Sequence, residues 1–248
     1  MAPRRRVRAR SALFAPLSFL LICAALVFGP SVFFRVNNIT VEGNSLYTDE
    51  EIIEASGIEP GDNLFFINRA AAYSRIYARL PYVEDGGISI TRSLPNRLLI
   101  RVVESDALAY VTAEDGDWVI DRKCKLLSRA ENGEQNSLIR IDGLTPIAPK
   151  AGQTVAPGEA ETPKVTYLAA ILRQVSDLGL RGSIAYIDIS NVANPELDYL
   201  GRFTVKLGTN ENVEYKFQVL LSAVASLAEG DRGTLDLSID KRAHLSYD

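Results

Sequence analysis

Histidine and cysteine are scarce in this chain of 248 residues, which contains one histidine and two cysteines. The single histidine, His244, is close to the end of the sequence, so no serine–histidine–aspartate set for nucleophilic catalysis is expected. A cluster of histidine and cysteine metal ligands is excluded for the same reason, and no glycine-rich phosphate loop follows an expected strand. The sequence therefore predicts no catalytic residue, no metal ligand and no bound cofactor.

The two cysteines do not form a disulfide framework. Cys23 lies inside an apolar stretch and Cys124 lies far beyond it, so we do not expect them to pair. Lys123 and Lys125 flank Cys124 and would favour a thiolate. Because no second cysteine or histidine is nearby in the sequence, we expect a buried and unreactive thiol instead.

Charged residues are absent from the 22 residues of Leu13–Phe34. Because roughly 20 apolar residues span a bilayer as a helix, this stretch predicts a transmembrane segment. Five arginines lie within residues 4–10, and the positive-inside rule places this short tail, residues 1–12, in the cytoplasm. The alternative is a cleaved secretory signal, whose apolar region of about 7 to 15 residues and small-residue cleavage site do not match this stretch.

Acidic residues outnumber basic ones beyond the apolar stretch. Five of the 27 lysines and arginines precede this stretch, and all 31 acidic residues follow it. The part of the chain after Phe34, called the exterior part below, therefore has a formal net charge of 22 minus 31, or −9. That charge argues against nucleic acid or an anionic lipid surface as its main partner. With 47% apolar and 23% charged residues, the whole chain has the composition of a packed globular protein.

The residues after the apolar stretch predict a strand followed by a helix. Apolar and polar residues alternate from Val36 to Val41, which is typical of a strand with one buried face. Thr48 and Glu51 have the spacing of a capping box at the start of a helix. Gly57 is then expected to end this helix.

A second helix and two more strands complete this region. A short extended piece is expected at residues 63–67. The helix that follows is expected to be capped by Asn68 and to end at Pro81. One strand is expected to begin at Val83, with Ile88 and Ile90 on one face, and another is expected over Leu98–Val103. A small sheet with two helices on one face would bury all of these apolar stripes, which predicts an α+β fold.

This order of elements resembles a POTRA domain, and its motifs resemble the FtsQ family of bacterial cell-division proteins, called DivIB in Gram-positive bacteria. The matching segments are Ile39–Asn44, Thr48–Ile52, Gly57–Phe65, Leu80–Val83, Leu94–Leu98 and Ile100–Glu104. The resemblance implies a POTRA domain at residues 35–104 and a second, β domain at residues 105–240, followed by a tail at 241–248. Each motif is common by itself, whereas their order after a membrane anchor is specific.

The resemblance continues into the second domain. Paired strands are expected at 107–111 and 118–121, and Cys124 stands where the family usually has a turn glycine. Residues 145–163, rich in proline and glycine, predict an exposed loop. Two amphipathic helices and further strands follow, and Asn210 or Asn212 is expected to cap the second helix. This domain is therefore expected to be a mixed or antiparallel sheet with two helices.

The last expected strand, residues 233–240, is the candidate partner-binding site. Its alternating pattern predicts one buried and one exposed face, and a last strand often lies at the edge of a sheet. The family resemblance implies that the partner FtsB, or DivIC, adds a strand here. The predicted partner-binding residues are Thr234, Leu235, Asp236, Leu237, Ser238 and Ile239. The alternative from the residues alone is an ordinary core strand.

The function implied by the resemblance is that of a non-catalytic scaffold in the membrane at the division septum. Its implied partners are FtsB or DivIC and FtsL, and through them the septal peptidoglycan synthase pair FtsW and FtsI. One alternative is a POTRA-bearing translocation or assembly factor, which the two amphipathic helices after residue 163 disfavour. The other is a membrane-anchored cell-wall hydrolase, for which no catalytic constellation is visible in the sequence.

Overall fold

The computed structural model describes residues 16–23, 25, 33–131, 133–156, 158, 161–238 and 244–246. These residues divide between two compact units, one within residues 1–77 and 83–104 and the other within 78–82 and 105–248. Each unit combines a sheet with helices, so the α+β class is confirmed.

Half of the predicted membrane segment lies outside the described residues. Residues 16–23 are helical, and the tail at residues 1–12 is not described. In the part of the chain that the structure describes, no helix is both long enough and apolar enough to cross a membrane.

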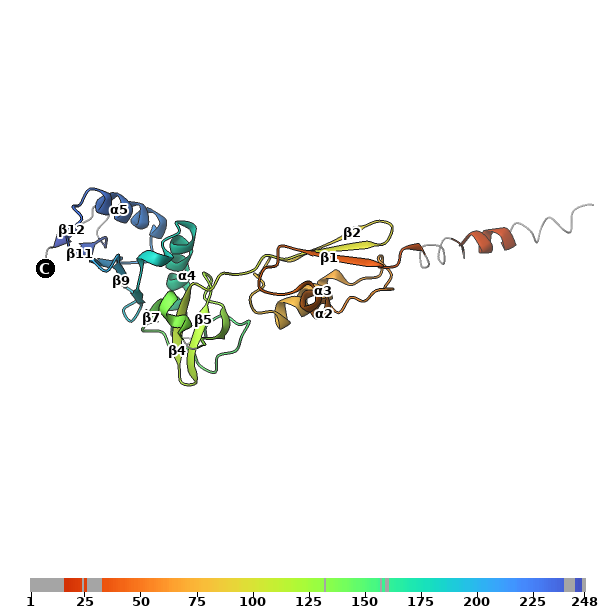
Figure 1. Cartoon of the computed structure of the whole chain (residues 1–248), viewed down its shortest axis with the longest axis horizontal. Coiled ribbons are helices and arrows are strands. Elements are labelled where there is room, and N and C mark those ends of the chain that lie inside the picture. Colours follow the sequence, from red (N-terminus) through yellow and green to blue (C-terminus); the bar gives the residue numbers. More distant parts are fainter. Residues whose placement is uncertain are drawn as a thin grey trace, which may run out of the picture. The chain divides into compact units, whose positions relative to one another are not determined.

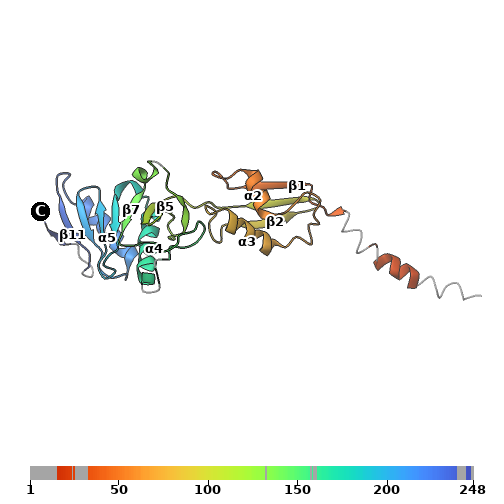
Figure 2. The same ribbon diagram turned by 90° about the horizontal axis from the view of Figure 1, so that it is seen from below.

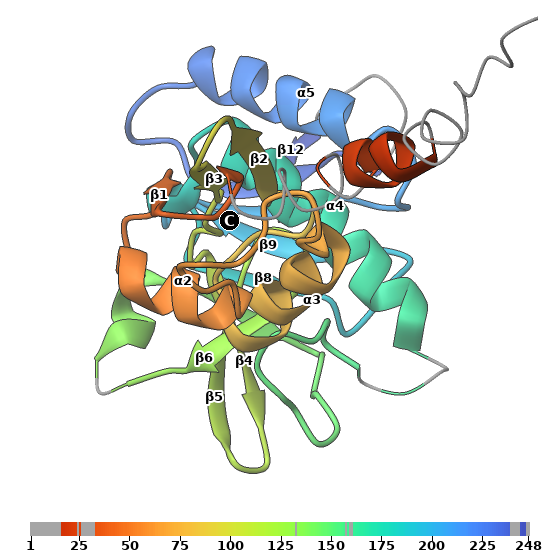
Figure 3. The ribbon, with the colours of Figure 1, turned by 90° about the vertical axis from the view of Figure 1, so that its right-hand side faces the viewer.

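The first unit is a three-stranded sheet with two helices. Its strands are β1 (Asn38–Glu42), β2 (Ser89–Ser93) and β3 (Arg97–Arg101), in the spatial order β1-β3-β2. β1 is parallel to β3, and β2 is antiparallel to β3. The helices α2 (Asp49–Ser56) and α3 (Arg69–Arg79) lie together on one side of this sheet (Figures 1 and 3).

The helix boundaries of this unit follow the local signals in the sequence. Thr48 accepts a hydrogen bond from the Glu51 amide at 3.2 Å, and Glu51 accepts one from the Thr48 amide at 2.8 Å, so the capping box is confirmed. Gly57 ends α2 with φ of +62°. Asn68 caps α3 by accepting from the Ala71 amide at 3.0 Å.

Apolar side chains of both helices and the sheet form the core of this unit. Ile52 of α2, Ile76 of α3 and Ile100 of β3 are completely buried. The expected extended piece at residues 63–67 is wrong for most of its length. Only Asn63 pairs with another strand-like residue, Arg35, and residues 64–66 form a turn.

A single carboxylate anchors the loop that follows β1. Glu104 accepts hydrogen bonds from the amides of Ser45, Leu46 and Tyr47 at 2.8, 2.8 and 3.1 Å. The Ser45 hydroxyl donates a fourth bond at 2.7 Å. Partial burial opposes ionisation, but these four bonds outweigh it and lower the pKa of Glu104 below its usual value of 4.5. The negative charge therefore stabilises the folded first unit.

The second unit contains a nine-stranded mixed sheet. The strands are β4 (Ala109–Ala113), β5 (Gly116–Ile120), β6 (Leu126–Arg129), β7 (Ile139–Asp142), β8 (Tyr186–Asp188), β9 (Glu196–Tyr199), β10 (Phe203–Lys206), β11 (Gly233–Asp236) and β12 (His244–Ser246). Their spatial order is β12-β11-β10-β9-β8-β7-β4-β5-β6, and Figure 2 shows β5, β7 and β11 as parts of this one sheet. The pairs β4–β7, β7–β8 and β10–β11 are parallel. The short 3-10 helices Glu134–Ser137 and Arg181–Ser183 lie in its connections.

Two helices cover one face of this sheet. α4 (Thr162–Asp177) connects β7 to β8, and α5 (Val213–Ala225) connects β10 to β11. The inward side chains of successive strands pack with those of the helices in one continuous core, which includes Ile141, Val205, Leu172 and Phe217. The alternate residues, such as Arg140 and Lys206, lie on the opposite, more exposed face.

Two sequence expectations need adjustment in this unit. The loop predicted at residues 145–163 ends earlier, because α4 begins at Thr162 with Pro163 in its first turn. Asn212 does occupy the N-cap position of α5, as expected, but its side chain makes no capping hydrogen bond.

Replacing Glu104 by glutamine should loosen the first unit. The substitution removes the negative charge that accepts four hydrogen bonds. The free energy of opening of β1 and β3 should therefore fall. The loss should be about 1 to 2 kcal/mol, because the carboxylate is partly exposed to solvent. The readout is amide hydrogen exchange of residues 38–42 and 97–101. Glu114→Gln in the exposed β4–β5 turn is the matched control and should leave exchange in those strands unchanged.

The effect should depend on pH in a defined direction. Because the folded state lowers the pKa of Glu104, its stabilisation is complete above the unfolded pKa and is lost as pH falls through the folded pKa. The native chain and the Glu104→Gln variant should therefore differ at neutral pH and converge at an acid pH below the folded pKa of Glu104. An equal difference at both pH values would contradict a role for the charge.

Candidate partner-binding surface

The six residues predicted to bind a partner are split between the two faces of the sheet. Leu235 and Leu237 are 1% and 3% exposed and belong to the core. Thr234 and Asp236 are half-buried, and Ser238 is exposed. The alternation inferred from the sequence is therefore confirmed for residues 234–238. Ile239 lies outside the described residues.

The expectation that this strand is the sheet edge is wrong, because β11 is paired on both sides. It lies parallel to β10 and antiparallel to β12. The regular strand also stops at Asp236 rather than continuing to residue 240. The Asp236 side chain accepts a hydrogen bond from the Ser238 amide at 2.8 Å, which turns the backbone there.

The described edge of the sheet at this end is β12, a strand of three residues. His244, Leu245 and Ser246 lie opposite Asp236, Leu235 and Thr234. Leu245 packs against the main core, whereas His244 and Ser246 are exposed. Sequence reasoning assigned these residues to a tail, because an apolar–polar alternation cannot be recognised over three residues.

Backbone directions identify which groups of β12 face outward. The amides of Gly233 and Leu237 donate to carbonyls of Arg202 and Lys206, on the β10 side, at 3.2 and 2.8 Å. Backbone groups alternate along a strand, so those of Thr234 and Asp236 point toward β12. In an antiparallel pair, Leu245 then directs its N–H and C=O away from β11. Leu245 thus offers one outward donor and one outward acceptor.

Asp236 lies between two basic groups on the exposed face of the sheet. Lys206 is its register neighbour on β10 and His244 its neighbour on β12. Partial burial opposes ionisation of Asp236, but hydrogen bonds from Ser238 and the charges of Lys206 and His244 lower its pKa. The carboxylate is therefore ionised at neutral pH next to the edge strand.

A glycine allows the chain to cross closely beside the end of β11. Gly208 has φ of +69°, and a Cβ there would lie 2.6 Å from the Cα of Ser238. The amide of Gly208 donates to the Asn194 side chain at 2.8 Å. Only glycine fits this approach without displacing Ser238.

Cys124 is a buried residue and not a reactive site. Its side chain has no exposed surface, and burial, followed by the nearby Asp121 carboxylate, raises the pKa of its thiol. The expected buried thiol is therefore confirmed. Its φ of +60° shows why a turn glycine suits this position, since left-handed backbone is strained for other residues. Within the described ranges, no group of three or more histidine, cysteine and acidic residues is arranged to hold a metal ion.

The first unit defines the class of protein. Residues 34–105 match the family model of the FtsQ-type POTRA domain, which agrees with its two helices on a three-stranded sheet. The chain is thus a POTRA-domain protein with a second, sheet-containing unit.

Cell-division proteins of several bacteria are similar to most of this chain. The chain is 25% identical to the cell division protein DivIB of Clostridium botulinum over 96% of this chain and 90% of that protein. It is 26% identical to DivIB of Clostridium acetobutylicum over 83% of this chain and 80% of that protein. It is 28% identical to the cell division protein FtsQ of an Anaeromyxobacter species, over 96% and 81%. These relatives and the FtsQ-type POTRA domain at residues 34–105 support a place for the chain in the FtsQ/DivIB family of cell-division proteins and a role in the divisome.

Replacing Gly208 by alanine should destabilise the second unit through contact with Ser238. Gly201→Ala is the matched control, because Gly201 has a similar φ of +63° but open space around its Cβ position. The control should cost about 1 kcal/mol from backbone strain alone, and Gly208→Ala at least about 2 kcal/mol. Denaturant unfolding followed by the fluorescence of Trp118, which lies in this unit, measures both. Equal losses would show that the close approach to Ser238 has no energetic consequence.

Proposed function

We propose that the protein is a non-catalytic scaffold that spans the membrane once and joins small membrane-anchored division proteins at the septum. In this proposal residues 1–12 are a cytoplasmic tail and 13–34 the anchor, while the POTRA domain (35–104) and the β domain (105–240) lie outside the cytoplasm. The partners are proteins like FtsB or DivIC and FtsL, and the complex supports septal peptidoglycan synthesis by an FtsW–FtsI pair. Family membership and the uncharged stretch after five arginines support this assignment.

The observation that carries the partner-binding proposal is the edge strand β12. An edge strand offers unpaired backbone groups to which an extended segment of another protein can bind. The partner strand pairs with the outward groups of Leu245. On the outer face of the predicted strand, the half-buried Thr234 and Asp236 lie opposite Ser246 and His244 of β12 and, with the exposed Ser238, contribute to specificity. The buried Leu235 and Leu237 support the strand from within the core.

The proposed role requires no chemistry from the chain itself. The single histidine, His244, lies on the edge strand, and the sole cysteine of the second unit is buried. Both features are consistent with a protein that acts through binding.

Proline at position 245 tests pairing at the outer edge. Leu245→Pro removes the outward N–H and should weaken capture of the FtsB- or DivIC-like partner at least about tenfold, since each backbone hydrogen bond contributes about 1 kcal/mol and the ring obstructs the partner strand. Leu245→Ala is the matched control: it loses the same apolar packing but keeps the N–H. Binding of the full chains, purified in detergent, is measured by titration. Equal affinities of the two variants would contradict pairing at this edge.

A truncation after Ser238 distinguishes two modes of strand addition. Loss of binding supports pairing outside β12, whereas tighter binding would mean that the partner takes the place of β12 beside β11. Leu237→Pro, which the sequence alone suggests as a test, is less informative. The Leu237 amide bonds to Lys206 inside the sheet, so this variant would disturb the fold itself.

Depletion of the protein in its host tests the division role separately. The expected result is filaments or enlarged cells without septa, seen by microscopy. Normal septation after complete depletion would contradict the proposal.

A further inference from the structure

The POTRA domain begins without any linker after the uncharged stretch that ends at Phe34. The Phe34 carbonyl accepts a hydrogen bond from the Leu64 amide at 2.8 Å, and the Val36 amide donates to Asp62 at 2.8 Å. The Gly61 amide in turn donates to the Val36 carbonyl at 2.7 Å. These bonds fix the loop of residues 61–66 directly beside the point where the proposed anchor ends.

Large apolar side chains are exposed at this same end of the domain. Phe66 is 79% exposed and Phe65 45%, and the ring of Phe65 meets that of Phe34 edge to face at 5.0 Å. Leu94, in the β2–β3 turn, is 58% exposed. That turn lies at this end too, because the Asn37 amide donates to the Asn96 carbonyl at 2.9 Å.

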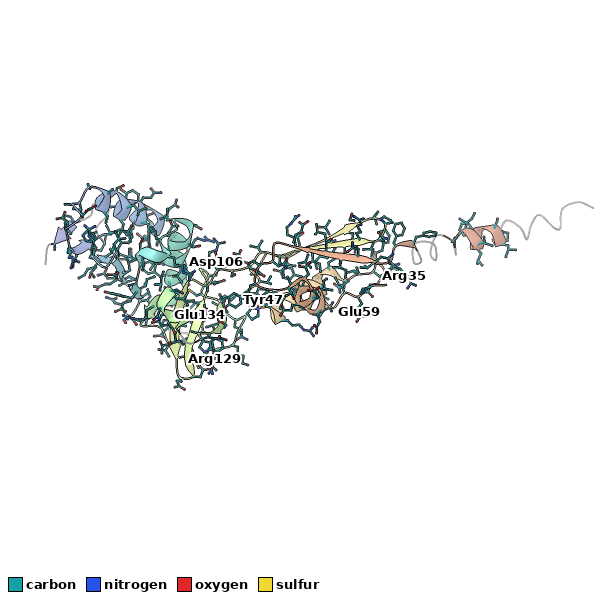
Figure 4. The ribbon with its side chains drawn as sticks, in the orientation of Figure 1. Arg35, Tyr47, Glu59, Asp106, Arg129 and Glu134 are labelled. Carbon is teal, nitrogen blue, oxygen red and sulfur yellow. The ribbon has the colours of Figure 1, made fainter. Side chains whose placement is uncertain are left out.

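Three arginines lie at the same end of the domain as these apolar side chains. Arg35 precedes β1, and Arg97 lies opposite Asn38 at the first residues of the paired strands. Arg92 donates to the carbonyl oxygens of Phe65 and Ile67 at 3.4 Å. Two acidic residues, Glu59 and Asp62, are also nearby; the Asp62 carboxylate accepts from the Glu59 amide at 3.0 Å. Figure 4 shows Arg35 and Glu59 at this end and Tyr47 at the opposite end of the domain.

We propose that this end of the POTRA domain inserts Phe65, Phe66 and Leu94 into the headgroup region of the bilayer. The inference rests on the proposed anchor, because continuity of the backbone is what places the loop at the membrane surface. Phenylalanine and leucine side chains with arginines beside them are typical of protein segments that bind at a membrane surface. The exterior charge of −9 disfavours attraction to an anionic surface, so the contact depends on the apolar side chains. The arginines reach lipid phosphates at its rim.

A tryptophan at position 66 reports this contact directly. The full chain with Phe66→Trp is reconstituted in vesicles of phosphatidylcholine. The acyl chains of this lipid are brominated near the headgroup, and bromine quenches tryptophan fluorescence on contact. Position 66 is exposed, so the variant should fold. The expected result is blue-shifted emission from residue 66 that is quenched by the brominated lipid. The signal of the native Trp118 is measured in the parent protein and subtracted.

Leu46→Trp is the matched control. Leu46 is 56% exposed and belongs to the loop after β1, next to Tyr47 at the opposite end of the domain. A tryptophan there should keep red-shifted, unquenched emission. If both positions were quenched, the domain would lie flat on the bilayer and a contact specific to this end would be wrong.

The remaining outcomes separate the docking contact from the anchor. If the protein stays with the vesicles after an alkaline wash and residue 66 is not quenched, the anchor stands and the docking contact is overturned. A blue shift without quenching would show that a protein surface, such as a second copy, covers the loop instead of lipid. Release of the protein by the alkaline wash would overturn the anchor and this inference together.

Discussion

Parallel strand pairing is the constraint on which both units depend. Two parallel neighbours cannot be joined by a hairpin, so the chain must cross from one end of the sheet to the other between them. α4 makes this crossing between β7 and β8, and α5 makes it between β10 and β11. In the first unit, α2, α3 and β2 lie between the parallel strands β1 and β3. The parallel pair β4 and β7 is connected through β5, β6 and the 3-10 helix Glu134–Ser137. In the other crossings, the apolar faces that the helices turn toward the sheet form the cores.

Local signals in the sequence were sufficient to predict the elements that make these crossings. The Thr48–Glu51 capping box, Gly57 and Asn68 act within one or two helical turns. The helix ends that they determine can therefore be predicted without knowledge of the fold. The inside and outside faces of residues 234–238 were predictable for a similar reason, since strand alternation is a property of neighbouring residues.

The order of strands in the sheet could not be predicted from the sequence. For this reason β11 was predicted as the edge strand, whereas the described edge is β12. Whether residues 234–238 lie at an edge depends on what pairs beside them, and β12 has only three residues, too few for the sequence to show a strand pattern. A three-residue strand gains its stability from pairing with β11 and from packing of Leu245, both of which are tertiary effects. The four hydrogen bonds to Glu104 could not be predicted either, because their donors belong to residues nearly sixty positions away in the sequence.

The buried thiol at Cys124 links redox chemistry to conformational stability. Outside the cytoplasm, where we propose that this unit lies, an accessible lone thiol would be open to oxidation or to disulfide exchange with other proteins. Cys124 has no exposed surface in the folded unit, so an oxidant reaches it only when the surrounding core opens. The rate of oxidative damage at this position is then set by the opening equilibrium of the second unit, and a well-packed core protects it as effectively as a reducing compartment would.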